Sequence, residues 1–177
     1  MKDNLFRQLS IFKKIKDSEE LRKCIYDVVN NLLEKTTTFN RPGMLLGRVQ
    51  GGKTNAYLGI IALSFDNGYD IALILQKGTK ALSEQTLQRI REDYKEFIEN
   101  DQVKVFDIMS FPSNLPKFVL NQKIIIVAKK QIDNLQRVLG VMIKTYPNLK
   151  EKRILIIADA ADFASICFRR TSQENKI

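Results

Sequence analysis

Gly47-Arg-Val-Gln-Gly-Gly-Lys53-Thr54 is the strongest indication of a fold class in this chain. Two glycines separated by four residues and followed by Lys-Thr match the pattern of a phosphate-binding loop. Glycine lets the backbone curl so that successive N–H groups point at phosphate oxygens, which larger side chains would obstruct. The ammonium of Lys53 would reach the β- and γ-phosphates, and the Thr54 hydroxyl would ligate Mg²⁺. The sequence therefore predicts a nucleoside-triphosphate and Mg²⁺ site at Gly47, Gln50, Gly51, Gly52, Lys53 and Thr54.

The residues on both sides of this loop supply the strand and the helix that the pattern requires. Residues 43–47 form a short apolar run typical of a buried strand, and residues 55–65 have the composition of a buried helix. A helix that starts at the loop also directs its positive dipole end at the same phosphates. The alternative is a glycine turn followed by a stray Lys-Thr pair, which this context disfavours.

Apolar runs and helical periodicities alternate along the rest of the chain. Strands are expected at residues 71–75, 103–108, 124–127 and 153–157, and helices at residues 80–100 and 131–146. Short apolar strands separated by helices pair in parallel through right-handed crossovers. The expected fold class is α/β, a three-layer P-loop domain with a mostly parallel sheet over residues 39–177. Ligands of such sheets bind at the carboxyl ends of the strands.

An N-terminal helical appendage is expected over residues 1–38. The apolar cluster in residues 5–15 fits a short amphipathic helix, and Asp17 or Ser18 offers an N-cap for a second one. The apolar positions of that second helix, within residues 21–33, recur with a period of about 3.6 residues. Plain packing explains both helices.

Composition excludes several functional classes. The 177 residues are 44% hydrophobic and 28% charged, which is typical of a globular protein. They contain no histidine, which excludes His-ligated zinc hydrolases and Ser-His-Asp enzymes, so no zinc is expected. The formal net charge of +9 suggests polyanionic partners, although a basic surface also serves solubility. No apolar run reaches about 18 residues, and the charged N-terminus does not fit a secretory signal. A cytoplasmic protein without a membrane partner is the expectation.

An acidic residue for the metal is expected at the end of the last strand. Asp159 comes just after the apolar run 154–157, where a Walker B aspartate holds Mg²⁺ together with the loop hydroxyl. An ordinary turn after a strand also favours Asp, which is the alternative. The glycine loop upstream favours the metal role for Asp159.

Three segments resemble a known family. Asp-Ala-Ala-Asp at residues 159–162 resembles the D-E-A-D box of superfamily-two helicases, with alanine in place of glutamate. Residues 46–54 are similar to the V-Q-S-G-K-T loop of a bacterial branch of DEAD/DEAH-like ATPases, and residues 75–86 to that branch's segment after its second strand. The resemblance covers roughly residues 40–170 and implies the first RecA-like domain of an ATP-hydrolysing helicase. Because the branch often occurs in restriction and phage-defence loci, it also implies antiviral defence.

The altered box changes the expected activity. In the family the glutamate of the box polarises the attacking water, and this chain has Ala160 at that position. Loss of a positioned base commonly lowers the rate about 10²–10⁴-fold, so ATP binding is expected to survive while hydrolysis is impaired. The substitution is either engineered to trap nucleotide, or natural, in a pseudo-ATPase or an enzyme with another base. The second RecA-like domain that such helicases need, or a partner subunit in its place, is expected outside this chain, which alone should not unwind a duplex.

Basic segments after two strands are the candidate contacts to single-stranded DNA or RNA. These are Lys77, Gly78, Thr79 and Lys80 after the second strand, and Lys129 and Lys130 after the fourth. A hydroxyl, a glycine N–H and a helix N-terminus together suit phosphate oxygens. Ordinary solvated lysines are the alternative. Two rival functions also stay open: a regulatory P-loop ATPase with a protein partner, and a non-enzymatic module that retains the fold.

Overall fold

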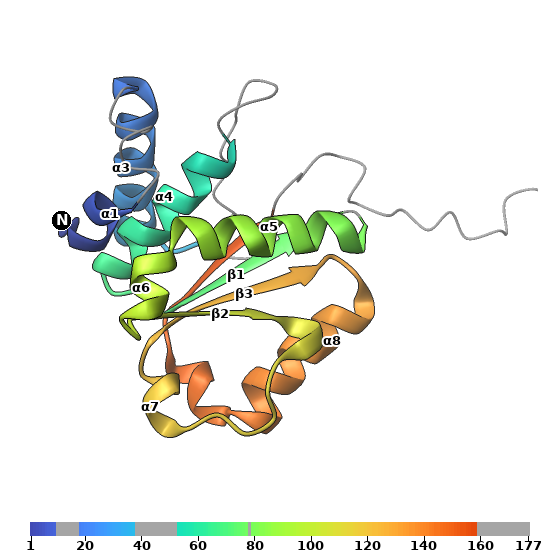
Figure 1. Cartoon of the computed structure of the whole chain (residues 1–177). Coiled ribbons are helices and arrows are strands. Elements are labelled where there is room, and N and C mark those ends of the chain that lie inside the picture. Colours follow the sequence, from blue (N-terminus) through green and yellow to red (C-terminus); the bar gives the residue numbers. More distant parts are fainter. Residues whose placement is uncertain (10–17, 38–52, 78, 159–177) are drawn as a thin grey trace, which may run out of the picture.

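A computed structural model of the chain describes residues 1–9, 18–37, 53–77 and 79–158 (Figure 1). Within these residues a four-stranded sheet has the order β2-β3-β1-β4, and every neighbouring pair is parallel. The strands are β1 (Ile71–Gln76), β2 (Val103–Asp107), β3 (Lys123–Lys129) and β4 (Ile154–Ala158). Four predicted strands and their parallel pairing are thus confirmed, and the strand expected at 43–47 lies outside the described residues.

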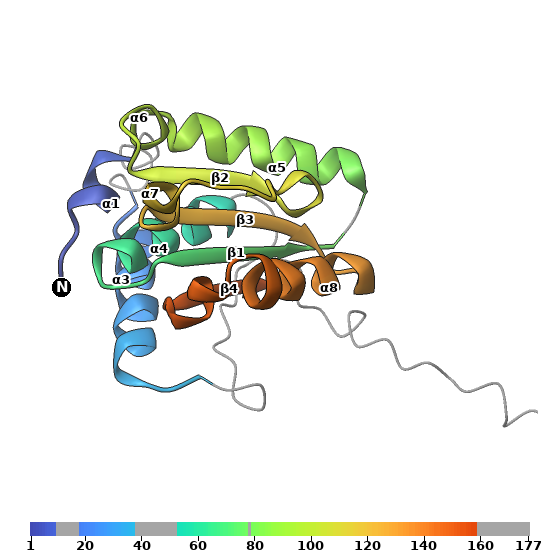
Figure 2. The ribbon, with the colours of Figure 1, turned by 90° about the horizontal axis from the view of Figure 1, so that it is seen from below.

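Helices cover both faces of the sheet, which gives the predicted three-layer α/β architecture (Figures 1 and 2). One side carries α1 (Asn4–Gln8), α3 (Glu19–Glu34), α4 (Lys53–Asp66), α5 (Lys80–Asp93) and α6 (Lys95–Glu99). The other side carries α7 (Lys117–Leu120), α8 (Ile132–Gly140), η2 (Val141–Thr145) and η3 (Pro147–Glu151). None of the described helices is both long and apolar enough to cross a membrane.

The central strand β1 shows why the sequence builds two cores. Side chains alternate between the faces of a strand. Ala72 and Ile74 pack into the cluster under α4 and α5, while Ile71 and Leu73 pack into the cluster under α8. A strand buried on both faces needs an uninterrupted apolar run, which is what β1 and β3 have.

Two crossovers run in opposite directions along the sheet. The connection from β1 through α5 leads to β2 on one edge, whereas the connection from β3 through α8 leads past β1 to β4. Because such crossovers are right-handed, opposite directions place α5 and α8 on opposite faces. The connections therefore diverge between the adjacent strands β1 and β3. A point of this kind opens a crevice at the carboxyl ends of the strands, where ligands of α/β sheets bind.

The prediction of one helix over residues 80–100 is wrong at Tyr94. There φ is −102° and ψ is 14°, and the chain changes direction between α5 and α6 (Figure 1). The ring of Tyr94 is fully buried, and its hydroxyl donates to the Leu58 carbonyl at 2.8 Å. The bend lets Tyr94 and Phe97 enter the same core, with their ring centroids 6.1 Å apart. Burial raises the pKa of Tyr94 well above its ordinary value of 10.0.

The other long helix keeps its predicted extent with a change in winding. It begins at Ile132 and passes into the wide turn η2, in which the Tyr146 N–H donates to the Val141 carbonyl at 2.8 Å. It ends before Pro147, as the sequence predicted.

The strand expected to reach residue 108 ends at Asp107, whose carboxylate caps a short 3₁₀ turn by accepting from the Met109 N–H.

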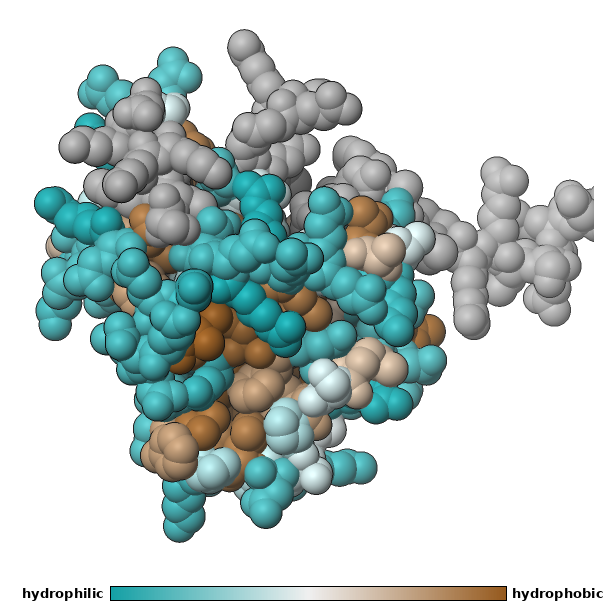
Figure 3. All heavy atoms as spheres, in the orientation of Figure 1, coloured by the Kyte–Doolittle hydropathy of each residue, from teal (hydrophilic) through white to brown (hydrophobic). Residues whose placement is uncertain are grey.

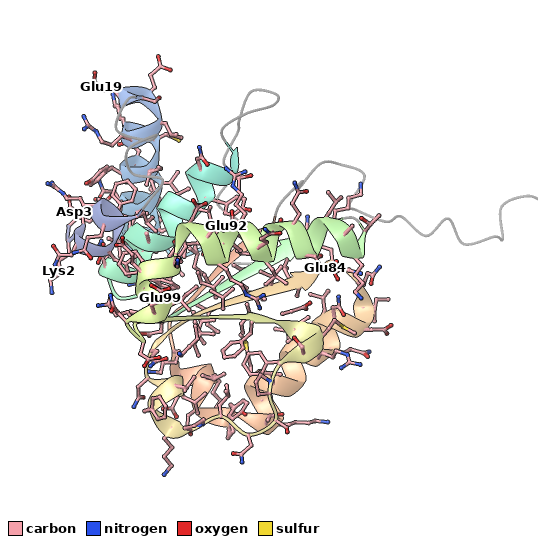
Figure 4. The ribbon with its side chains drawn as sticks, in the orientation of Figure 1. Lys2, Asp3, Glu19, Glu84, Glu92 and Glu99 are labelled. Atoms are coloured by element: carbon pink, nitrogen blue, oxygen red, sulfur yellow. The ribbon has the colours of Figure 1, made fainter. Side chains whose placement is uncertain are left out.

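The N-terminal helices pack on α4. The predicted cap of α3 is confirmed, since the Ser18 hydroxyl accepts from the Leu21 N–H at 3.2 Å. Asp3 lies beside α1 (Figure 4) and accepts from the Tyr26 hydroxyl at 2.8 Å and from Arg7 Nε at 2.6 Å. These two hydrogen bonds, the Tyr26 bond first, lower the pKa of the Asp3 carboxyl. The carboxylate thus fastens α1 to α3.

Candidate functional site

The start of α4 lies at the carboxyl edge of the sheet. α4 follows the glycine stretch directly in sequence, with Lys53 as its first residue and Thr54 half-buried in its first turn. After Asp66 a turn at Gly68 leads straight into β1, so α4 runs antiparallel to the strand (Figure 1). Fourteen helical residues span about 21 Å and six strand residues about 20 Å. The N–H groups at the N-terminus of α4 therefore lie at the level where the strands end.

The last described strand brings the acidic segment to the same edge. Ala158, the final residue of β4, pairs with Leu75, the penultimate residue of β1. Asp159 is the next residue in the chain. The parallel register thus starts the acidic segment beside the end of β1 and on the same edge as Thr54.

The predicted basic residues gather at the diverging ends of β1 and β3. Gln76 pairs with Lys129 in the register of the two strands, and the Lys130 N–H donates to the Gln76 carbonyl at 2.7 Å. Lys77 follows Gln76 directly. Lysines therefore lie at the adjacent carboxyl ends of both strands.

Thr79 and Lys80 complete this basic edge. Thr79 is the N-cap of α5, with its hydroxyl accepting from the Leu82 N–H at 3.4 Å. Lys80 lies 3.6 Å from Glu84, and both side chains are largely exposed, so the pair holds Lys80 only weakly. Figure 4 shows Glu84 on α5.

Part of the predicted site lies outside the described residues. This holds for Gly47, Gln50, Gly51, Gly52, Gly78, Asp159 and Ala160, and for the side chain of Lys53. In the described part of the chain no three Asp, Glu, Cys or His side chains gather into a cation site. The predicted Mg²⁺ ligands are Thr54 from α4 and Asp159, whose carboxylate and hydroxyl oxygens suit that cation.

Sequence reasoning missed a set of polar contacts behind this edge. Gln76 is 5% exposed, and its Nε2 donates to the Thr86 hydroxyl of α5 at 2.6 Å. Its Oε1 is buried without a hydrogen-bond partner among the described residues. Arg89 of α5 donates from Nη2 to Asn55 Oδ1 at 2.6 Å. A glutamine at the end of an apolar strand was the available signal for Gln76, whereas nothing local distinguishes Arg89 from its exposed neighbours.

A hollow in the described surface lies away from this edge. It measures about 260 Å³ and opens at the outer edge of β2, under α5 and α6. Figure 3 shows apolar surface in this region, bordered by hydrophilic side chains. The lining residues are Arg91, Lys95, Ile98, Glu99, Lys104, Val105 and Phe106. The hollow contains none of the predicted site residues and plays no part in the site.

The chain matches no protein-family model, and no curated protein matches it significantly. The carboxyl edge and the motifs that border it are the features of this chain that indicate a function.

Proposed function

We propose that this chain is the nucleotide-binding half of a P-loop ATPase that acts on single-stranded nucleic acid. One observation carries the proposal: the N-terminus of α4 and the ends of β1, β3 and β4 share one edge of a parallel sheet. The phosphate-loop motif directly precedes that helix and the acidic motif directly follows β4. The resemblance of both motifs supports the first RecA-like domain of a DEAD/DEAH-like ATPase, with a role in antiviral defence.

Different residues bind the phosphates of ATP and the Mg²⁺ ion. Lys53 and the N–H groups of the glycine loop bind the phosphate oxygens, aided by the dipole of α4. Thr54 and Asp159 hold the Mg²⁺ that neutralises the phosphates. Ala160 provides no base to activate water, so nucleotide is held and hydrolysed slowly.

Single-stranded nucleic acid fits the basic edge beside the nucleotide. Lys77, Lys80 and Lys129 place positive charge at the ends of two adjacent strands, and the N-terminus of α5 adds N–H donors. Contacts of this kind read the backbone and not the sequence of bases.

A regulatory ATPase with a protein partner is the second candidate, and a separate observation favours it. Apolar side chains recur along the outer side of α8 and η2. The exposed fractions are 66% for Ile132, 56% for Leu139 and 59% for Ile143. Contiguous exposed apolar surface marks protein–protein contacts. Binding of this chain to a single-stranded oligonucleotide at low salt separates the two candidates, because a protein-directed switch has no need of it.

Isothermal titration with Mg-ATP tests the nucleotide site. We expect the wild-type chain to bind, and Lys53→Ala to lose at least about tenfold in affinity, because a charge-assisted phosphate contact is removed. Lys95→Ala is the matched control: it removes the same charge from α6, remote from the carboxyl edge. Equal heats from the wild type and Lys53→Ala would contradict the proposal.

A further inference from the structure

We propose that Arg89 is a positioning residue for nucleotide, which holds the first turn of α4 in its phosphate-binding geometry. The inference rests on the proposed function and adds a residue that no motif contains. Arg89 lies in the middle of α5, on a different element from the glycine loop. It acts on the nucleotide through Asn55 and not by contact of its own.

The contact itself is short and charge-assisted. Arg89 Nη2 lies 2.6 Å from Asn55 Oδ1, and Asn55 directly follows Thr54. The first N–H groups of a helix have no partners within it and are the ones that bind phosphate. A hydrogen bond from a guanidinium is about twice as strong as one between neutral groups. Arg89 therefore fixes the side chain next to the predicted Mg²⁺ ligand in the turn whose N–H groups must be aligned.

Arg89 is itself held in place by its surroundings. Its Nε lies 3.8 Å from Asp93 Oδ2, one turn further along α5. Thr86, three residues before Arg89 and on the same side of the helix, bonds to the buried Gln76 at the end of β1. This bond holds α5 against the end of β1 near the candidate site. The part of α5 that carries Arg89 is therefore fixed in position when Arg89 contacts Asn55.

A second tie between the same two segments lies one turn away. The Tyr94 hydroxyl donates to the Leu58 carbonyl at 2.8 Å, and Leu58 is three residues after Asn55 on α4. The bond from Tyr94 holds the later turns of α4, and the buried side chains of those turns also hold them in the core. Arg89 makes a side-chain hydrogen bond from α5 to the half-buried first turn, so its loss frees that turn and leaves the rest of α4 in place.

The effect on affinity follows from one hydrogen bond. Without Arg89 the Asn55 oxygen turns to water, and the first turn loses its constraint before nucleotide arrives. Binding must then order the turn, which lowers affinity by about 3- to 10-fold for a loss equal to one net hydrogen bond. The Arg89 side chain is 44% exposed, so its removal should barely change the stability of the protein without nucleotide.

A double-mutant cycle tests this role in the full chain. Mg-ATP affinity is measured by titration calorimetry, and the midpoint of thermal unfolding without nucleotide, for wild type, Arg89→Ala, Asn55→Ala and the double variant. We expect each single variant to bind about 3- to 10-fold more weakly, the double variant no more weakly than either, and the unfolding midpoints to agree within about 2 °C. Arg89→Lys, which keeps a cationic donor, should recover part of the affinity.

The control is Arg91→Ala, on the same helix. Arg91 carries the same charge and makes no hydrogen bond or ion pair with the described residues, so its affinity should equal that of the wild type. Unchanged affinity in Arg89→Ala, or losses that add in the double variant, would overturn the positioning role and leave the nucleotide site standing. Absence of Mg-ATP binding by the wild type itself would overturn both proposals.

Discussion

Gly68 occupies a backbone conformation that other residues adopt only with strain. Its φ is +95°, in the turn that joins α4 to β1, and nothing lies within 4 Å of where a Cβ would be. Gly140 also has empty space around its missing Cβ, but it is helical, with φ −59°. The two glycines therefore separate backbone conformation from steric contact.

Gly68→Ala and Gly140→Ala should change stability in opposite directions. Forcing a Cβ into left-handed backbone lowers the free energy of unfolding by about 1–2 kcal/mol. Alanine in a helix removes conformational freedom from the unfolded chain and raises that free energy by about 0.5–1 kcal/mol. Urea unfolding of the two variants and the wild type measures both changes. Destabilisation by both substitutions would show that contacts, not backbone conformation, decide.

At this scale the sequence predicts what is local. The caps at Ser18 and Thr79 follow from a hydroxyl three residues before the N–H that it accepts from. The Arg89–Asn55 contact joins residues 34 apart in sequence, and only the packing of α5 on α4 brings them together. Its polar partners look like ordinary solvated positions until that packing is known.

Asp66 shows that one element can cap another. It ends α4, and its two carboxylate oxygens accept from the N–H groups of Leu5 and Phe6 in the first turn of α1, each at 3.0 Å. Negative charge at a helix N-terminus also suits the helix dipole. Phe6 of α1 is fully buried in the core shared with α4, so the cap and the apolar contact act together.

Asp66→Ala should lower the free energy of unfolding by about 1–2 kcal/mol, the range for loss of a helix cap. Asp66→Asn keeps one oxygen acceptor and should lose less. Asp27→Ala is the control, because Asp27 is an exposed carboxylate on α3 whose side chain has no hydrogen bond within the described residues. Guanidinium unfolding monitored by circular dichroism compares them, and an equal loss in Asp27→Ala would rule out capping as the cause.

Element boundaries are where the sequence predicted least. The apolar period of residues 80–100 runs through Tyr94 without interruption, because Tyr94 at the bend and Phe97 after it are both buried in the core. The bend depends on how much space lies between α5 and the sheet, and the periodicity of the sequence carries no information about that space. Pro147, by contrast, acts through its own missing N–H, so the end of its helix was predicted correctly.

Lysines lie at both ends of the strands of the sheet, and their effect on nucleic-acid binding can be compared. Lys77 and Lys129 lie at the carboxyl ends of neighbouring strands. Lys144 and Lys150 come after α8, toward the amino ends of the strands. The double variant Lys77→Ala, Lys129→Ala should bind an oligothymidylate more weakly. The plot of log K for binding against log salt concentration should also become shallower, its negative slope shrinking by about 1.4. Lys144→Ala with Lys150→Ala removes equal charge and should leave that slope unchanged. Fluorescence anisotropy over a salt series measures both, and equal slopes for the two pairs would mean that net charge alone attracts the strand.

The sequence predicted the class of the fold but not the order of its strands. Apolar runs announce buried strands, and their separation by helices requires parallel pairing. β1 and β3 carry similar Ile- and Leu-rich or Ile- and Val-rich side chains, so composition alone does not decide which neighbour each strand takes. The half-buried β2, with Lys104 and Phe106, was the better clue, since such a strand suits an edge.

The position of β4 beside β1 has a consequence for synthesis and refolding. β1, β2 and β3 can pair among themselves before β4 is made, because none of their contacts needs it. During that interval the side of β1 that later receives β4 presents bare N–H and C=O groups beside apolar side chains, a template for another chain. Ile154 must then return to Ile71 from far along the sequence, and distant pairings of this kind form slowly. Crowded nascent or refolding chains are therefore most prone to misassembly at the strand that later becomes the centre of the candidate site.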